Sequence, residues 1–319
     1  MKLTKEQIKS IAFGYTEIIE EEKGLRFCNM TKKQREAFSA YDEISLPFDG
    51  GFTGRSSLAT GVRLDFHTDS KSFGFNAVTK VAFEVSIDGL LYRRYTPEEL
   101  PARIPLGEGE KRITLWFPSH SAVGYSLLSE VTLDDGASIT PHGYSEKLLF
   151  VGDSITHGWE SDYIPMAYTH RVASALNADF VVQGVSGAQF WPDTVDTLPF
   201  SPDRVFVAMG TNDIGMGKSE ADIRRDAADF YAKIANNYSQ KKLYAMTPIW
   251  RAFSNKEEKE RFLYASGIIK DEAEKHGFTV IDGMTLVPPI LAFYTDGLHP
   301  NAAGFSLMAE NILRAIKAK

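Results

Sequence analysis

Residues 148–155 read LLFVGDSI, in which four apolar residues are followed at once by a glycine and two polar side chains. An uninterrupted apolar run is typical of a strand in a parallel sheet, because such a strand is covered on both faces. Further short runs of this kind occur at residues 180–182, 205–208, 243–246 and 280–281. Segments of helical length alternate with them, at residues 166–177, 220–238, 255–276 and 301–317. The alternation predicts a doubly wound α/β sheet, where sites form at the carboxyl ends of the strands.

The chain before Pro141 shows a different pattern. Apolar and polar residues alternate over residues 62–66, 81–87 and 113–117, which indicates half-buried strands. Turn signals such as Asp88-Gly89 separate these runs, and the one convincing helical segment covers residues 32–41. We therefore predict a jelly-roll-like β-sandwich over residues 1–142, followed by an α/β domain over residues 143–319.

The junction between the two predicted domains is short and contains no flexible linker rich in glycine and serine. We therefore expect the sandwich to pack against the α/β domain, rather than to be freely tethered, and to supply one wall of a pocket. The segment 58–85 and the loop around His120 are both candidates for that wall.

The composition argues against several kinds of partner. The net charge is -7 and the basic pairs are scattered, so nucleic acid is not an expected partner. Cys28 is the only cysteine, which excludes an internal disulfide and a cysteine metal cage. The N-terminus lacks the apolar stretch of a signal peptide, and no apolar run has the length of a membrane span. We expect a cytoplasmic protein without a membrane partner, and the sequence leaves its oligomeric state open.

Four short polar blocks lie at the ends of predicted strands or at the start of the last predicted helix. In chain order they are Gly152-Asp153-Ser154-Ile155, Gly184-Val185-Ser186-Gly187, Gly210-Thr211-Asn212-Asp213 and Asp296-Gly297-Leu298-His299-Pro300. Because parallel strands end at the same edge of a sheet, the first three blocks are expected to meet there.

Together these blocks contain the groups that a serine esterase needs. Ser154 would be the nucleophile, His299 the base that removes its proton, and Asp296 the group that orients the histidine ring. The backbone N–H groups of Ser154 and Gly187 and the side-chain amide of Asn212 would stabilise the oxyanion. This chemistry requires neither a metal ion nor another cofactor.

The order of the blocks, GDSI, a glycine block, GTND and DGLH, resembles that of the SGNH hydrolases, also called GDSL esterases. The resemblance runs from about Lys147 to the C-terminus, with isoleucine in place of the leucine of GDSL. It implies a flavodoxin-like three-layer α/β/α fold, and the preceding β-region is similar to the sandwich of some carbohydrate acetylesterases. The family's functional residues match the serine, glycine, asparagine and histidine of the blocks, with the usual aspartate as third triad member: Ser154, Gly187, Asn212, His299 and Asp296.

Several other residues near the predicted strand ends are candidates to line the pocket, namely His157, Trp191, Trp250 and Arg251. Each has a structural alternative, as an exposed loop residue, a core aromatic or a member of a surface ion pair. Ser186 competes as a nucleophile, but it lacks the last glycine of a Gly-x-Ser-x-Gly elbow and is interpreted as a loop residue. Asp153 is interpreted as a residue that holds the loop.

These observations predict a serine esterase acting on small acyl groups, with O-acetyl esters of carbohydrates favoured by the resemblance. The absence of a long apolar lid segment disfavours a lipase, and a lipase or lysophospholipase-type acylhydrolase is the alternative within the family. A metallophosphoesterase is disfavoured because its site needs clustered histidine and carboxylate ligands, and the sequence offers only His299 with a nearby carboxylate. A non-catalytic carbohydrate-binding protein is the alternative outside the enzymes, and the intact set of reactive groups argues against it.

Overall fold

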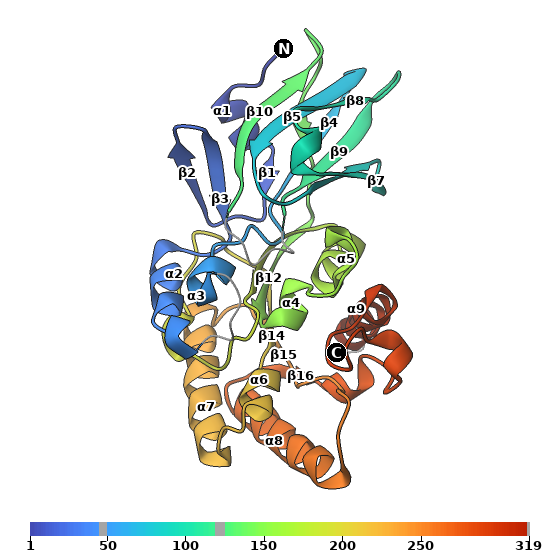
Figure 1. The fold of residues 1–319 in the computed structure, drawn as a ribbon. Helices are drawn as coiled ribbons and strands as arrows, with labels where there is room; N and C mark the ends of the chain where they lie inside the picture. Colours follow the sequence, from blue (N-terminus) through green and yellow to red (C-terminus); the bar gives the residue numbers. More distant parts are fainter. Residues whose placement is uncertain (45–49, 119–124, 318–319) are drawn as a thin grey trace.

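Two antiparallel sheets form most of the N-terminal part of the chain, and a parallel sheet with helices forms the C-terminal part (Figure 1). The computed structural model describes residues 1–44, 50–118 and 125–317. The sheets change from antiparallel to parallel between β11 (Thr140–Pro141) and β12 (Glu146–Gly152), close to the change in sequence pattern. The predicted fold class is confirmed, and the division into domains at residues 142 and 143 stays a prediction.

The two antiparallel sheets enclose one apolar core. One sheet consists, in order, of β1 (Ala12–Phe13), β4 (Arg63–Thr68), β9 (Lys111–Trp116), β6 (Phe83–Ile87) and β7 (Leu90–Tyr95), with β11 beside β4. The other consists of β2 (Glu17–Glu21), β3 (Gly24–Cys28), β10 (Leu127–Leu133), β5 (Ser72–Val78) and β8 (Ala102–Pro105). Alternate residues enter the core, such as Leu64 and Phe66 of β4 and Phe73 and Phe75 of β5. This period of two is the one that the sequence predicted.

The described residues of the N-terminal part also form the helices α1 (Lys5–Ser10), α2 (Lys32–Ser39) and α3 (Gly51–Arg55). Helix α2 confirms the predicted helix, whereas the expectation of a single helix was wrong. Helices α1 and α3 are six and five residues long, too short to show a helical period in the sequence. The start of α1 is instead fixed locally, by a capping box in which Thr4 and Gln7 satisfy each other's backbone N–H groups.

The C-terminal part contains a five-stranded parallel sheet in the order β13 (Ala178–Gly184), β12, β14 (Arg204–Ala208), β15 (Lys242–Met246) and β16 (Thr279–Ile281). This 2-1-3-4-5 order is that of flavodoxin-like folds. Its helices are α4 (Ser154–His157), α5 (Tyr168–Ala175), α6 (Thr211–Gly215), α7 (Glu220–Asn237), α8 (Lys256–Lys275) and α9 (Ala302–Lys317). Shorter 3₁₀ turns occur at Asp42–Ile44, Pro97–Glu99, Ile164–Met166, Pro192–Thr194, Gly283–Thr285 and Leu291–Phe293.

Helices cover both faces of the parallel sheet. Leu149 and Val207 point to the core shared with α7 and α8, whereas Phe150 and Phe206 point to the core shared with α5 and α9. Neighbouring residues of one strand therefore enter opposite layers, which explains why the strands read as continuous apolar runs. Among the helices of the described ranges, none has both the length and the apolar character that crossing a bilayer requires.

Part of the N-terminal region packs against the parallel sheet and not into the sandwich. Phe38 of α2 and Phe52 of α3 belong to the same core cluster as Leu149, and Figure 1 shows both helices beside the parallel sheet. The side-chain amide of Gln34 donates to the side-chain oxygen of Gln183 over 3.0 Å. Packing thus joins the two parts of the chain next to the end of β13.

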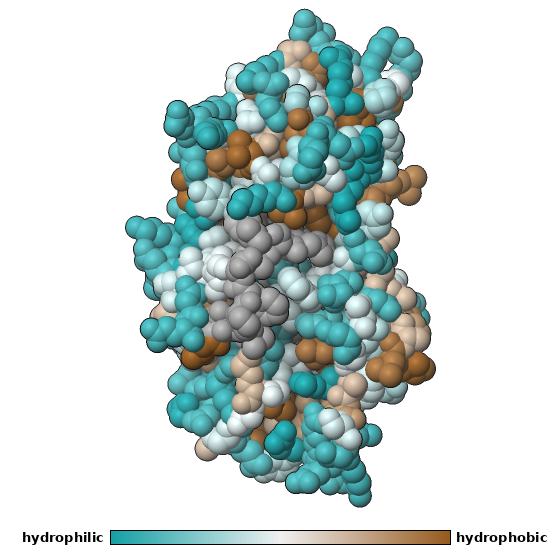
Figure 2. Space-filling model, viewed as in Figure 1, coloured by the Kyte–Doolittle hydropathy of each residue, from teal (hydrophilic) through white to brown (hydrophobic). Residues whose placement is uncertain are grey.

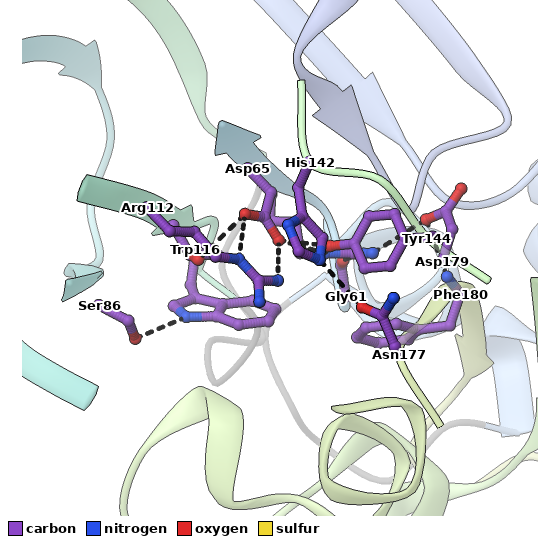
Figure 3. A network of polar contacts seen from close by, with 12 residues as sticks. Gly61, Asp65, Ser86, Arg112, Trp116, His142, Tyr144, Asn177, Asp179 and Phe180 are labelled. Carbon is purple, nitrogen blue, oxygen red and sulfur yellow. Dashed lines mark hydrogen bonds and ion pairs between the residues drawn. The ribbon is translucent and has the colours of Figure 1, made fainter. Parts of the chain in front are cut away.

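A buried network of charges forms a second contact between the two parts (Figure 3). Arg63 and Asp65 lie on the face of β4 that is turned away from the sandwich core, and both are fully buried. Arg63 donates to Asp179 of β13 and to the Tyr144 hydroxyl, each over 2.9 Å. Arg112 donates to both oxygens of Asp65, over 2.8 and 2.7 Å, and the Tyr144 hydroxyl donates to the same carboxylate.

The ionised form of Asp65 is favoured by its partners. Burial alone would raise the pKa of this carboxyl, but Arg112 and Arg63 outweigh burial and hold the pKa below its usual value. Charges buried in this way are tolerated because each one is hydrogen-bonded to an opposite charge.

Removing Asp65 should therefore destabilise the protein strongly. Asp65→Ala leaves Arg112 and Arg63 without their shared carboxylate, and we expect a loss of about 3–5 kcal/mol in the free energy of unfolding. Urea unfolding measures the change. Glu108→Ala is the control, since it removes a carboxylate from an exposed ion pair with Lys71 and should have little effect. If Asp65→Ala lowered the free energy of unfolding as little as Glu108→Ala does, the network would not stabilise the fold.

Candidate active site

The first three sequence blocks meet at the carboxyl edge of the parallel sheet. Ser154 begins α4 directly after β12, Gly187 lies in the loop after β13, and Asn212 lies in α6 after β14. All three line one pocket together with His299, which precedes α9. The pocket encloses about 150 Å³. It lies where β12 pairs with both β13 and β14, the switch point at which flavodoxin-like folds bind ligands.

Ser154, His299 and Asp296 form a continuous chain of hydrogen bonds. The Ser154 Oγ lies 2.8 Å from His299 Nε2, and His299 Nδ1 lies 2.7 Å from Asp296 Oδ2. The second oxygen of Asp296 accepts the N–H groups of Leu298 and His299, over 2.9 and 2.8 Å. The backbone of the turn holds the Asp296 carboxylate in place, and the carboxylate in turn orients the His299 imidazole. Burial alone would raise the pKa of Asp296, but the hydrogen bonds from His299 and Leu298 outweigh it and lower the pKa.

Three residues that line this pocket, Ser154, Gly187 and Asn212, carry N–H donors. Within the described ranges, the backbone N–H groups of Ser154 and Gly187 donate to no acceptor. The Asn212 amide donates one hydrogen to the Ala188 carbonyl over 2.9 Å, which orients its second hydrogen. Gly187 has a φ of 84°, a conformation in which a side chain would be strained. The Asn212 amide is thus oriented by the protein itself, without a bound ligand.

His157 and Ser186 form a second serine–histidine contact in the pocket lining. His157 Nδ1 lies 3.1 Å from Ser186 Oγ, and the histidine is buried. The structure thus places His157 in the pocket lining, as one of the two sequence interpretations expected, and not at an exposed loop position. Ser186 contacts this histidine, whereas Ser154 contacts the histidine that is bound to a carboxylate.

Asp153 lies beside Ser154 and caps the helix that follows. Its Oδ1 accepts the Ile155 N–H over 2.9 Å at the start of α4. Burial raises the pKa of the Asp153 carboxyl to about 7, against the effect of that hydrogen bond. The contact holds the turn on which Ser154 lies.

The other three predicted lining residues are not among the residues that line this pocket in the described part of the chain. Trp191 lies in the core, where it stacks on Tyr41 with 3.9 Å between ring centroids. Trp250 packs against Tyr294, and the Arg251 guanidinium lies against Gly215. Aromatic and basic residues after a strand can turn into a core or along a loop, and the sequence did not distinguish these directions from the pocket.

Two lining residues escaped the sequence analysis, namely Arg55 and Trp159, and Leu298 was named there only as part of the fourth block. Trp159 follows the first block by four residues and Leu298 lies within the fourth, so their positions in the sequence were the available signal. Arg55 and Leu58 come from the N-terminal part, and Leu58 is the first residue of the segment 58–85 proposed for a pocket wall. No sequence signal marks Arg55, because its position depends on how the two parts pack. The other candidate, the loop around His120, lies outside the described residues.

Metal ligands do not gather in the described part of the chain: no three side chains of His, Cys, Asp or Glu lie close enough together to hold an ion. The groups that the described pocket offers are one hydroxyl–imidazole–carboxylate chain and a set of N–H donors. Such an arrangement can activate an oxygen nucleophile and stabilise an oxyanion.

Comparison with known proteins identifies the family of the α/β part. Residues 150–307 match the model of the GDSL-like Lipase/Acylhydrolase family, and all four sequence blocks fall inside this range. No curated protein matches the chain.

Solved structures show the same fold at low sequence identity. A salicylyl-acyltransferase from a tetracycline biosynthetic pathway is 19% identical with a TM-score of 0.76, covering 96% of this chain and 94% of that chain. A family two carbohydrate esterase from Clostridium thermocellum, in complex with cellohexaose, is 16% identical with a TM-score of 0.65, covering 81% and 92%. An acetyl xylan esterase from the rumen bacterium Butyrivibrio proteoclasticus is 16% identical with a TM-score of 0.59, covering 81% and 90%.

The match over residues 150–307, together with the shared fold, shows that the α/β part of the chain belongs to the GDSL-like lipase/acylhydrolases, the SGNH family of carboxylic ester hydrolases.

Proposed function

We propose that this protein is a serine esterase that hydrolyses small acyl esters, with Ser154 as nucleophile, His299 as general base and Asp296 as the residue that orients His299. The observation that carries the proposal is the hydrogen-bonded chain from Ser154 Oγ through His299 to Asp296, at 2.8 and 2.7 Å. It lies in a pocket that also contains Gly187 and Asn212.

The geometry supports a two-step mechanism. Ser154 Oγ attacks the acyl carbon while its proton passes to His299 Nε2, and Asp296 stabilises the imidazolium through Nδ1–H. The tetrahedral intermediate collapses to an acyl-enzyme as His299 returns the proton to the departing alcohol. A water molecule then gives a proton to His299 and attacks the acyl carbon, which releases the acid and regenerates the Ser154 hydroxyl.

The proposed oxyanion hole consists of the backbone N–H groups of Ser154 and Gly187 and the Asn212 amide. Each donor is fixed by the fold: Ser154 by the start of α4, Gly187 by its loop and Asn212 by its bond to the Ala188 carbonyl. Donors fixed before the reaction need no reorganisation when negative charge develops on the acyl oxygen.

The pocket favours a short acyl group. Its volume of about 150 Å³ is well below the ~300–1,000 Å³ of pockets for drug-sized ligands. Leu58, Trp159 and Leu298 supply its apolar surface. Carbohydrate esterases share the fold, so we propose O-acetyl groups on carbohydrates as the substrates.

A lipase is the less favoured member of the same family. On the face shown in Figure 2, outside the grey residues, apolar side chains form small patches separated by hydrophilic ones. An enzyme acting at a lipid surface would be expected to expose a larger continuous apolar patch. The described part of this face therefore favours a dissolved ester as substrate.

Acyl transfer is a second candidate function, because an acyltransferase matches 96% of this chain with a TM-score of 0.76. Hydrolysis and transfer share the acyl-enzyme and differ in the oxygen nucleophile that resolves it. Product analysis with a sugar alcohol present separates them: free acid at an unchanged rate indicates hydrolysis, and a new ester indicates transfer.

The nucleophile can be tested by substitution and labelling. Ser154→Ala should abolish esterase activity while leaving the melting temperature nearly unchanged, because only one hydroxyl is lost. A fluorophosphonate probe should label Ser154, as mapped by peptide mass spectrometry. Ser186→Ala is the matched control: it should keep the labelling of Ser154 and lose far less activity than Ser154→Ala. Labelling on Ser186, or activity that survives Ser154→Ala, would assign catalysis to the Ser186–His157 pair instead.

Asn212 should act mainly in the transition state. Asn212→Ala is expected to lower kcat by about 10²–10³ with little change in KM, the usual effect of losing one oxyanion donor. Steady-state kinetics measure both constants, and the melting temperature checks that losing the contact with Ala188 has not disturbed the loop. A change confined to KM would mean that Asn212 binds substrate and does not stabilise the oxyanion.

The acyl preference follows from the size of the pocket. With p-nitrophenyl esters of increasing chain length, kcat/KM should be highest for acetate and should fall steadily towards the octanoate. Acetylated xylo- or cello-oligosaccharides should then release acetate in a Ser154-dependent manner. A preference for long chains would support the lipase-type alternative and reject the small-acyl proposal.

A further inference from the structure

The peptide group between Ser186 and Gly187 lies in the lining of the catalytic pocket, next to an arginine of the N-terminal part that lines the same pocket. Arg55, the last residue of α3, donates from Nη1 to the Ser186 carbonyl oxygen over 2.9 Å. That carbonyl and the Gly187 N–H belong to one planar amide. The arginine therefore bonds to one end of the peptide group whose other end is a proposed oxyanion donor.

Arg55 is fixed in this position by its surroundings. Only 4% of the residue is exposed, and its guanidinium lies 4.8 Å from the centre of the Phe52 ring. Its Nη1 is 3.1 Å from the point that a Cβ on Gly187 would occupy, so it fills the space beside that glycine. Burial lowers the pKa of Arg55 while Asp42 acts in the opposite direction, and arginine keeps its charge in proteins.

A charged donor on a carbonyl changes the amide in two ways. It draws electron density towards the oxygen, which makes the N–H of the same amide a stronger donor, because hydrogen bonds in a chain polarise one another. It also restricts rotation of the peptide plane. Such restriction matters here because Gly187 has a φ of 84°, and a glycine permits many backbone conformations. A rotated plane would turn the N–H away from the pocket.

We propose that Arg55 is a positioning residue for the oxyanion hole: it holds and polarises the Ser186–Gly187 peptide group so that the Gly187 N–H stabilises the oxyanion. The proposal rests on the esterase function proposed above. If Arg55 acts in this way, the N-terminal part assists the chemical step through the hydrogen bond from Arg55 to the Ser186 carbonyl. Arg55 itself need not contact the reacting atoms. The hydrogen bond between His157 and Ser186 constrains the same loop from its side-chain face.

The kinetic test compares Arg55→Lys, Arg55→Met and Arg55→Ala with the unmodified protein. Arg55→Met should lower kcat on p-nitrophenyl acetate by about tenfold to a hundredfold with KM nearly unchanged, below the ~10²–10³ expected for loss of a whole oxyanion donor. Arg55→Lys, which keeps the charge but not the planar fork, should lie in between. Added guanidinium ion should restore part of the kcat of Arg55→Ala.

Arg171→Met is the matched control. Arg171 of α5 is partly buried and, like Arg55, donates to a backbone carbonyl, that of Met166, over 3.0 Å, but it does not line the catalytic pocket. The substitution should leave kcat unchanged even if the melting temperature falls. A fall in the melting temperature of Arg55→Met with unchanged kcat would assign Arg55 a structural role alone and overturn the proposal.

Nuclear magnetic resonance provides a readout that does not depend on turnover. In ¹⁵N-labelled protein, the Gly187 amide proton should shift upfield in Arg55→Met, because its N–H loses polarisation, and should not move in Arg171→Met. If hydrolysis proved independent of Ser154, the esterase proposal would fail while this shift still reported the action of Arg55. An unmoved Gly187 resonance would overturn the inference whatever the activity.

Discussion

The parallel pairing of β12 with both β13 and β14 is the constraint on which the candidate active site depends. In this register Gly152 pairs with Gly184 on one side and Ala208 on the other, so the three strands end level. The sequence blocks that follow the three strands therefore lie at the same edge of the sheet. A Cβ on Gly152 would lie 2.0 Å from Thr156 Oγ1, and one on Gly184 would lie 2.3 Å from the backbone nitrogen of His157. The two glycines thus allow α4, with Ser154 at its start, to lie directly on the strand ends.

Much of this arrangement could be predicted from the sequence because its determinants are local. Continuous apolar runs marked the parallel strands, and the blocks directly after them marked the edge where a pocket forms. The turn from Asp296 to His299 is also local, since the backbone N–H groups of Leu298 and His299 hold the carboxylate.

Features that depend on distant packing could not be predicted. Arg55 reaches the pocket only because α2 and α3 pack beside the parallel sheet, and no pattern in residues 30–55 indicates this packing. The same reason explains Trp191, which stacks on Tyr41 from the N-terminal part and so enters a core. His157 was ambiguous for a related cause, because its burial depends on the loop after β13. The N-terminal part is therefore connected to the site by specific contacts, while the charged network around Arg63 and Asp65 connects it to the α/β part elsewhere.

The central claim is that Ser154 becomes acylated during turnover. Rapid mixing with p-nitrophenyl acetate, followed by acid quenching and peptide mass analysis, tests it most directly. We predict a burst of p-nitrophenol and an acetyl group on the peptide that carries Ser154, decaying at the rate of turnover. Hydrolysis without a covalent adduct, or an acetyl group on Ser186, would contradict the account.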